Sequence, residues 1–173
     1  MEVADRFFKS KHILSKELCE QLISEHKDFV IKEEAKKEID GIIHKCNWSR
    51  VELKYNQKFE KILNEKLFLS FQPIDFKKVE CSFVTYTEGQ GYDRHVETIK
   101  GLPLNDDYEG GEVEVYDVWY KNDRDTFSVV RPKVGECLIY KPYQHVTYRN
   151  VTKNKKYQVL VMIKNKDLKK NLI

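Results

Sequence analysis

The sequence lacks several features that define whole classes of protein. Its 173 residues contain no stretch close to the roughly 20 apolar residues that a membrane-spanning helix needs. Residues 1–6 include acidic side chains, and no apolar run of signal-peptide length follows them. Internal repeats, low-complexity tracts and linkers are absent too. We therefore expect a soluble cytoplasmic protein that makes no use of a membrane and folds as a single domain, 1–173.

An excess of charge of one sign is also missing. The chain has 31 basic and 28 acidic residues, for a formal net charge of +3 at pH 7. Such a mixed surface gives no support to a nucleic-acid partner, which would favour a basic patch or stripe.

Cysteines are few, and none forms a CxxC pair. The four lie at positions 19, 46, 81 and 137, a wide spacing that favours reduced thiols over a disulfide framework. Cys81 and Cys137 stand in apolar runs, which predicts buried structural side chains.

The first 70 residues have a helical pattern. Ser15 is a suitable N-cap for a helix that begins at Lys16. Two further apolar patterns suggest helices that lie on a flat partner. Their apolar positions are Ile31, Ala35, Ile39 and Ile43 in one, and Phe59, Ile62 and Leu63 in the other.

From residue 77 the pattern changes to short, alternating, β-branched and aromatic runs separated by turn signals. This texture predicts an α+β protein that is mainly β, with a double-stranded β-helix (jelly roll) over 77–164 and the helical layer of residues 1–70 packed on one sheet. The expected strands are 78–86, 112–120, 126–131, 136–141, 145–149 and 157–164.

Two of the five histidines, His95 and His145, lie in the strand half. Residues i and i+2 of a strand share a face, so His95 and Glu97 would project together. A second imidazole from a later strand, His145, would complete two nitrogens and one carboxylate on one side of a metal. That arrangement leaves coordination positions open and suits non-haem iron(II). The spacing alone is weakly specific.

The surroundings of these residues resemble the 2-oxoglutarate/iron(II) oxygenase superfamily, in particular its prolyl 4-hydroxylase-like branch. The resemblance covers roughly residues 83–163 in the family's order. The matching elements are Tyr86 to Glu97, Leu104-Asn105 followed by Glu109-Gly110-Gly111-Glu112, the turn Pro132 to Gly135, His145 and Lys156.

The resemblance implies a dioxygenase that hydroxylates an unactivated C–H bond, with release of succinate and CO2. It implies that His95, Glu97 and His145 hold Fe(II), and that Lys156 and Tyr86 bind the co-substrate 2-oxoglutarate. Ascorbate is left open as a further cofactor. Tyr92 and Arg94 would contact the substrate, which is most plausibly a prolyl residue in a protein or peptide, with a small molecule as the alternative. The oligomeric state stays open.

The sequence departs from the family pattern at three places. Glu97 stands where the family has Asp, and the short segment 98–103, which includes Pro103, suggests a missing or truncated strand. Lys155 competes with Lys156 for the basic position. The first two departures favour an alternative function, a catalytically degenerate jelly-roll binding protein. A cupin-type metalloprotein would have His-x-His ligands, which this sequence does not have.

Overall fold

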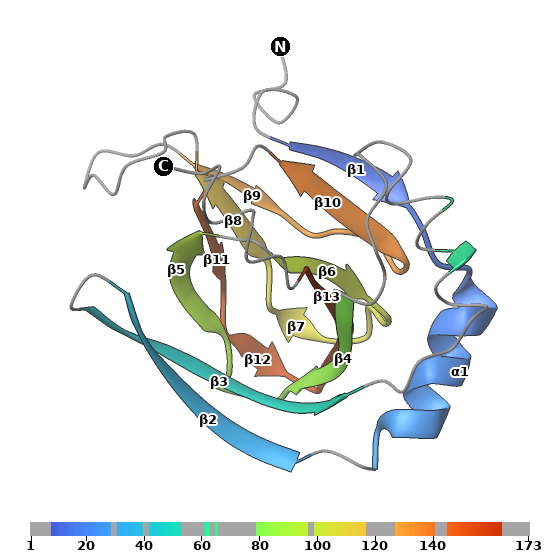
Figure 1. The fold of residues 1–173 in the computed structure, drawn as a ribbon, viewed down its shortest axis with the longest axis horizontal. Helices are drawn as coiled ribbons and strands as arrows, with labels where there is room; N and C mark the ends of the chain where they lie inside the picture. Colours follow the sequence, from blue (N-terminus) through green and yellow to red (C-terminus); the bar gives the residue numbers. More distant parts are fainter. Residues whose placement is uncertain are drawn as a thin grey trace.

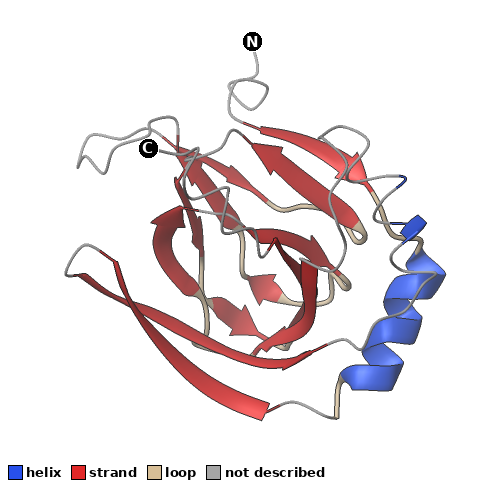
Figure 2. Ribbon diagram, viewed as in Figure 1, coloured by secondary structure: helices blue, strands red, loops and turns tan. Residues whose placement is uncertain are grey.

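The computed structural model of the chain describes residues 8–28, 31–39, 42–52, 61–62, 65, 79–96, 99–116, 127–140 and 145–163. Antiparallel strands dominate it, and they curl around a central interior with one helix at the side (Figures 1 and 2). The main sheet has nine strands, in the order β6-β13-β4-β3-β5-β11-β8-β9 with β2 paired to β3. Its elements and those of the two smaller pairs, β1-β10 and β12-β7, are β1 (Phe8–His12), α1 (Lys16–His26), β2 (Ile31–Ile39), β3 (Ile42–Glu52), β4 (Val79–Tyr86), β5 (Tyr92–Val96), β6 (Ile99–Pro103), β7 (Glu109–Gly110), β8 (Val113–Tyr116), β9 (Phe127–Val130), β10 (Glu136–Tyr140), β11 (His145–Tyr148), β12 (Val151–Lys153) and β13 (Lys156–Ile163).

The helix α1 begins where the sequence predicts. The Ser15 hydroxyl accepts a hydrogen bond from the Leu18 backbone N–H at 3.2 Å, so the N-cap satisfies a donor that the helix leaves open. Cys19 and Leu22 of α1 are buried against the outer face of the sheet. That face contributes Phe83 of β4 together with Val159 and Val161 of β13.

The second predicted helix is wrong, because residues 31–39 and 42–52 form the paired strands β2 and β3. A spacing of four residues is an even number, so such an apolar pattern fits one face of a strand as well as one face of a helix. The ladder pairs Ile39 with Ile42, which leaves only Asp40-Gly41 as the connection. Asp-Gly between two strands is a strong hairpin signal that the helical interpretation overlooked.

The third predicted helix is described only at Lys61, Ile62 and Glu65, all of which are helical. Phe59 and Leu63 lie outside the described residues. Within the described part of the chain, no helix has the length and apolar content needed to cross a membrane.

Of the two expectations for the segment after the His-x-Glu pair, a missing or a truncated strand, the first is wrong. Strand β6 is present over Ile99–Pro103 and pairs with β13. Pro103 is its last residue, and β6 stands at the end of the sheet order, where a residue without a backbone N–H is tolerated.

Alternation along the strands separates two cores. Inward residues such as Val84, Val115, Val146 and Leu160 form one cluster with several tyrosines inside the curled sheet. Outward residues form the second cluster beneath α1. Of the described cysteines, Cys19 and Cys137 are buried and Cys81 is half-buried. A polar side chain that is buried in the inner cluster is unfavourable unless it has hydrogen-bonding partners or a functional role.

Candidate functional site

Lys156 is a lysine buried inside the curled sheet. It begins β13, pairs with Tyr86 of β4 and is 2% exposed. Its Nζ donates a hydrogen bond to the Gly111 carbonyl oxygen at 2.9 Å. Three tyrosine rings surround the ammonium group at 5.3–5.7 Å from their centres, those of Tyr86, Tyr108 and Tyr148. One carbonyl and three rings offset only part of the cost of burying a positive charge.

The pKa of Lys156 is lowered from 10.5 to about 7; burial is the main cause, the nearby Arg131 guanidinium also lowers the pKa, and Glu112 opposes the shift. The charged and neutral forms are therefore close in free energy near neutral pH. An anion that entered beside Nζ would favour the charged form and raise this pKa. The arrangement thus suits a site for a carboxylate or a similar small anion.

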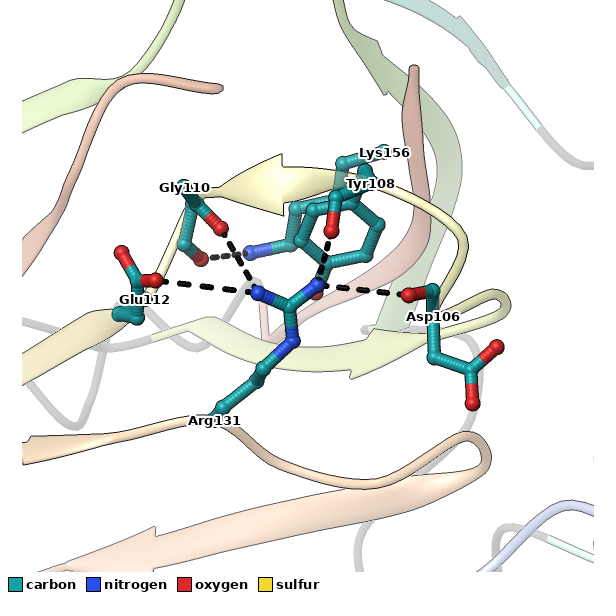
Figure 3. A network of polar contacts seen from close by, with 7 residues as sticks. Asp106, Tyr108, Gly110, Glu112, Arg131 and Lys156 are labelled. Atoms are coloured by element: carbon teal, nitrogen blue, oxygen red, sulfur yellow. Dashed lines mark hydrogen bonds and ion pairs between the residues drawn. The ribbon is translucent and has the colours of Figure 1, made fainter. Parts of the chain in front are cut away.

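Arg131 braces the segment that supplies the Gly111 carbonyl (Figure 3). Its guanidinium donates to the carbonyl oxygens of Gly110 at 3.2 Å and Asp106 at 3.4 Å, and also to that of Tyr108. It lies 4.2 Å from the centre of the Tyr108 ring and 3.7 Å from a Glu112 carboxylate oxygen. Gly110 and Gly111 have φ values of +72° and +69°, so this bend requires residues without a Cβ. Arg131, which directly follows β9, and Lys156 of β13 therefore contact the same bend from two sides.

A small pocket opens beside Lys156. Its cavity volume is about 10 Å³, which is room for about one water molecule. The lining side chains are apolar except for Lys156, the Tyr148 hydroxyl and the Gln158 amide. Besides Lys156, the lining includes Gly101, Pro103, Val113, Leu138, Tyr148 and Gln158. One cation and a few fixed polar groups in an apolar pocket is the usual composition of a site for a small charged ligand.

His95 lies on the inner face of β5 and is 5% exposed. Its ring stacks on Tyr92 with the ring centres 3.6 Å apart, and its Nδ1 lies 2.6 Å from the Asp93 carbonyl oxygen. A carbonyl only accepts, so Nδ1 carries the proton and the lone pair is on Nε2. This is the tautomer of a histidine that ligates metal through Nε2 with its other nitrogen held by the backbone.

His145 is oriented differently. The β5–β11 ladder pairs His95 with Val146 and His145 with Val96, so the two histidines point to opposite faces of the ladder. The half-buried His145 accepts a hydrogen bond at Nδ1 from Arg94 Nε at 2.9 Å. Arg94 also lies over the Tyr116 ring, 3.9 Å from its centre. Across the part of the chain that the structure describes, no three metal-ligating side chains converge.

The other predicted site residues divide into three groups. Tyr86 lies on the same face as Lys156, as its implied role requires. Tyr92 is buried in the inner cluster, whereas Arg94 is half-buried on the opposite face. Glu97 lies outside the described residues. Sequence reasoning missed Arg131 and Gln158. The signal for Gln158 was its position two residues after Lys156, which places both on one face of β13.

Comparison with solved structures shows the fold. A prolyl-4-hydroxylase from Pseudomonas putida is similar over 94% of this chain and 95% of its own, with a TM-score of 0.58 and 14% identity. A prolyl hydroxylase from Trichoplax adhaerens, in complex with a hypoxia-inducible-factor peptide fragment, has a TM-score of 0.61 and 11% identity over 95% of this chain and 86% of its own. HygX from Streptomyces hygroscopicus, with nickel and 2-oxoglutarate bound, has a TM-score of 0.62 and 12% identity over 92% of this chain and 83% of its own.

No family sequence model matches the chain, and no curated protein does so at a significant level. The fold is therefore shared at a sequence identity of 11–14% with these three structures. The similarity to prolyl hydroxylases and 2-oxoglutarate/iron(II) oxygenases that the motifs indicated is confirmed at the level of structure.

Proposed function

We propose that this chain is an iron(II)- and 2-oxoglutarate-dependent dioxygenase that hydroxylates an unactivated C–H bond, with a prolyl residue of a protein or peptide as the preferred substrate. The observation that carries the proposal is the buried Lys156 in a small pocket inside this fold. Structural similarity to a prolyl hydroxylase with a bound peptide fragment supports the substrate class.

Lys156 would bind the carboxylate of 2-oxoglutarate that lies far from the metal. A charged hydrogen bond inside an apolar pocket is strong and directional. Tyr86 faces Lys156 across the β4–β13 ladder, so its hydroxyl group belongs to the same proposed subsite. Burial favours Lys156 over its neighbour, since the Lys155 side chain is exposed.

His95, Glu97 and His145 would hold the iron, which when bound supplies the activation of dioxygen that the protein side chains cannot provide. Two imidazoles are suitable donors for non-haem iron(II), and the His95 tautomer fits. His145 can serve as an iron ligand only after it loses the hydrogen bond that it accepts from Arg94. Because the His145–Val96 pair ends the β5–β11 ladder, a local change there would turn His145 over without shifting the other pairs.

The remaining task of the chain's own residues is to orient substrates and exclude water. Tyr92 and Tyr148 pack around His95 and keep that side of the site apolar. Arg94, on the edge of this region, would contact the substrate once His145 is released. Such positioning is the protein's usual contribution when a cofactor carries the chemistry.

The test is to mix the apo-protein anaerobically with Fe(II) and 2-oxoglutarate and record the visible metal-to-ligand charge-transfer band. We expect a band in the native protein, none in His95→Ala or His145→Ala, and an unchanged band in the matched control His12→Ala. Absence of the band in the native protein at saturating iron and 2-oxoglutarate would refute the proposal.

A binding protein that keeps the fold without turnover is the second candidate. The hydrogen bond between Arg94 and His145 favours it, because Nδ1 accepts in that bond and the proton of the neutral ring is then on Nε2, the nitrogen that would ligate iron. This candidate predicts that 2-oxoglutarate or another dicarboxylate binds with no charge-transfer band and no succinate release.

Binding of 2-oxoglutarate should weaken as the pH rises. The pKa of Lys156 is lowered to about 7, so the free protein loses the positive charge as the pH passes from 6 to 9. We expect the dissociation constant to rise about tenfold for each pH unit well above 7 until the pKa of the complex is reached. Lys156→Arg stays charged throughout and should show a flat profile in calorimetric titrations at each pH. A flat profile in the native protein would contradict this prediction.

A further inference from the structure

Gln158 is a buried amide that lines the Lys156 pocket. It is 1% exposed and lies two residues after Lys156 on β13, so both side chains point to the same interior face. The ladders place Gln158 between Val84 of β4 and Pro103 of β6. Both cross-strand neighbours are apolar, which makes a primary amide at this position costly unless its polar atoms have partners.

The Gln158 amide keeps spare hydrogen-bonding capacity. A glutamine side chain has two N–H donors and one carbonyl acceptor. Among the described residues its one hydrogen bond runs from Nε2 to the Tyr86 hydroxyl oxygen, at 3.2 Å. Tyr86 is also the cross-strand partner of Lys156. Gln158, Tyr86 and Lys156 thus form one connected polar group on the pocket wall.

Gly101 gives the Gln158 side chain its space. A Cβ built on Gly101 would lie 3.2 Å from the Tyr148 hydroxyl oxygen and 3.5 Å from Gln158 Oε1. Gly101 and Gln158 both line the pocket. A methyl group on Gly101 would therefore be tight against the Tyr148 hydroxyl and in van der Waals contact with the Gln158 amide.

We propose that Gln158 is a specificity-determining residue that closes the far end of the Lys156 pocket and limits the bound 2-oxo acid to the length of 2-oxoglutarate. This inference rests on the proposed function. Lys156 supplies a positive charge, which can bind the carboxylate of any dicarboxylic acid. Gln158 supplies a fixed wall, and an acid that is longer by one methylene would collide with it. Gly101 permits this arrangement because it has no side chain.

The test compares 2-oxoglutarate with 2-oxoadipate, which is one methylene longer, by isothermal titration calorimetry. Mn(II) replaces iron so that no turnover occurs. In Gln158→Ala, the preference for 2-oxoglutarate over 2-oxoadipate should fall at least ~10-fold, the order of discrimination that one methylene gives. Gly101→Ala narrows the same space, so it should increase the preference for 2-oxoglutarate over 2-oxoadipate.

Gln158→Glu adds a negative charge with little change of shape. It should weaken both ligands at least ~10-fold, because a carboxylate there competes for Lys156 and repels the ligand. Gln21→Glu makes the same change on the exposed face of α1 and should leave both affinities unchanged. Thermal unfolding of each variant checks the fold, and Gln158→Asn, which shortens the side chain but keeps the amide, replaces any variant that does not fold.

An unchanged preference in Gln158→Ala, or an equal loss for both acids, would overturn the inference, since a purely structural amide predicts one of these results. Native-like binding by Gln158→Glu would overturn it as well. Failure of the native protein to bind either acid would instead overturn the proposed function on which the inference rests.

Discussion

Replacing Lys156 with methionine is expected to raise the dissociation constant for 2-oxoglutarate at least ~100-fold, equivalent to about 2.7 kcal/mol. The reason is that Lys156 is 2% exposed, so the substitution removes a charged hydrogen-bond donor from a largely apolar pocket. Calorimetric titration with 2-oxoglutarate and Mn(II) measures the effect directly.

The same substitution should leave the melting temperature unchanged or raise it. Methionine has a similar volume, and it removes a cation whose burial is only partly offset by Gly111 and the tyrosine rings. Lys155→Met is the matched control, because Lys155 is the adjacent lysine and is exposed. A comparable loss of affinity in both variants, or in Lys155→Met alone, would show that Lys156 is not the binding residue.

Replacing Gly135 with alanine should cost about 2–4 kcal/mol of unfolding free energy. Gly135 has a φ of +77°, and a Cβ there would lie 2.1 Å from the Leu14 carbonyl oxygen, a backbone atom. The Gly135 carbonyl oxygen accepts hydrogen bonds from Ile13 N and Leu14 N, so the clash falls where the N-terminal segment is attached. Urea denaturation provides the measurement.

Gly89→Ala measures the energetic cost of the left-handed backbone conformation in the absence of a steric clash. Gly89 has nearly the same φ, +80°, yet a Cβ there meets nothing within 4 Å. We expect it to cost only about 1–2 kcal/mol, the conformational penalty alone. Equal losses in the two variants would mean that the contact between Gly135 and Leu14 contributes nothing.

The strand half of the fold was predictable because its sequence has one dominant period. The expected strand 78–86 corresponds to β4 (Val79–Tyr86), and 136–141 corresponds to β10 (Glu136–Tyr140). The N-cap at Ser15 was equally predictable, since a short polar side chain just before a helical apolar pattern can accept a hydrogen bond from the first turn of the helix.

The β2–β3 hairpin was not predicted because a spacing of four residues fits both a helix and a strand face. The Asp40-Gly41 pair could have decided between them. Lys156 was identified from a motif, but no pattern in the sequence reveals that it would be buried or that Arg131 would act on it. Those properties depend on three-dimensional neighbours from β4, β9 and the bend before β8.

The orientation of His145 was also beyond the sequence. The motif places an imidazole on a strand near His95, but which face it points to depends on a register that changes with a single residue. The β11 ladder contains such an irregularity between Val146 and Tyr148. A hydrogen bond from Arg94, only one residue away from His95, could not be inferred from spacing alone.

The position of β13 in the sheet has a consequence for the order of events during synthesis. This last described strand pairs with both β4 and β6, and β1 pairs with the late strand β10. The β13 ladders cannot close until residues 156–163 have left the ribosome, and the β1–β10 ladder cannot close until residues 136–140 have done so. Contacts between residues so far apart in sequence are associated with slow folding. The strands that β13 joins should therefore remain open and protease-sensitive until residues 156–163 have been synthesised.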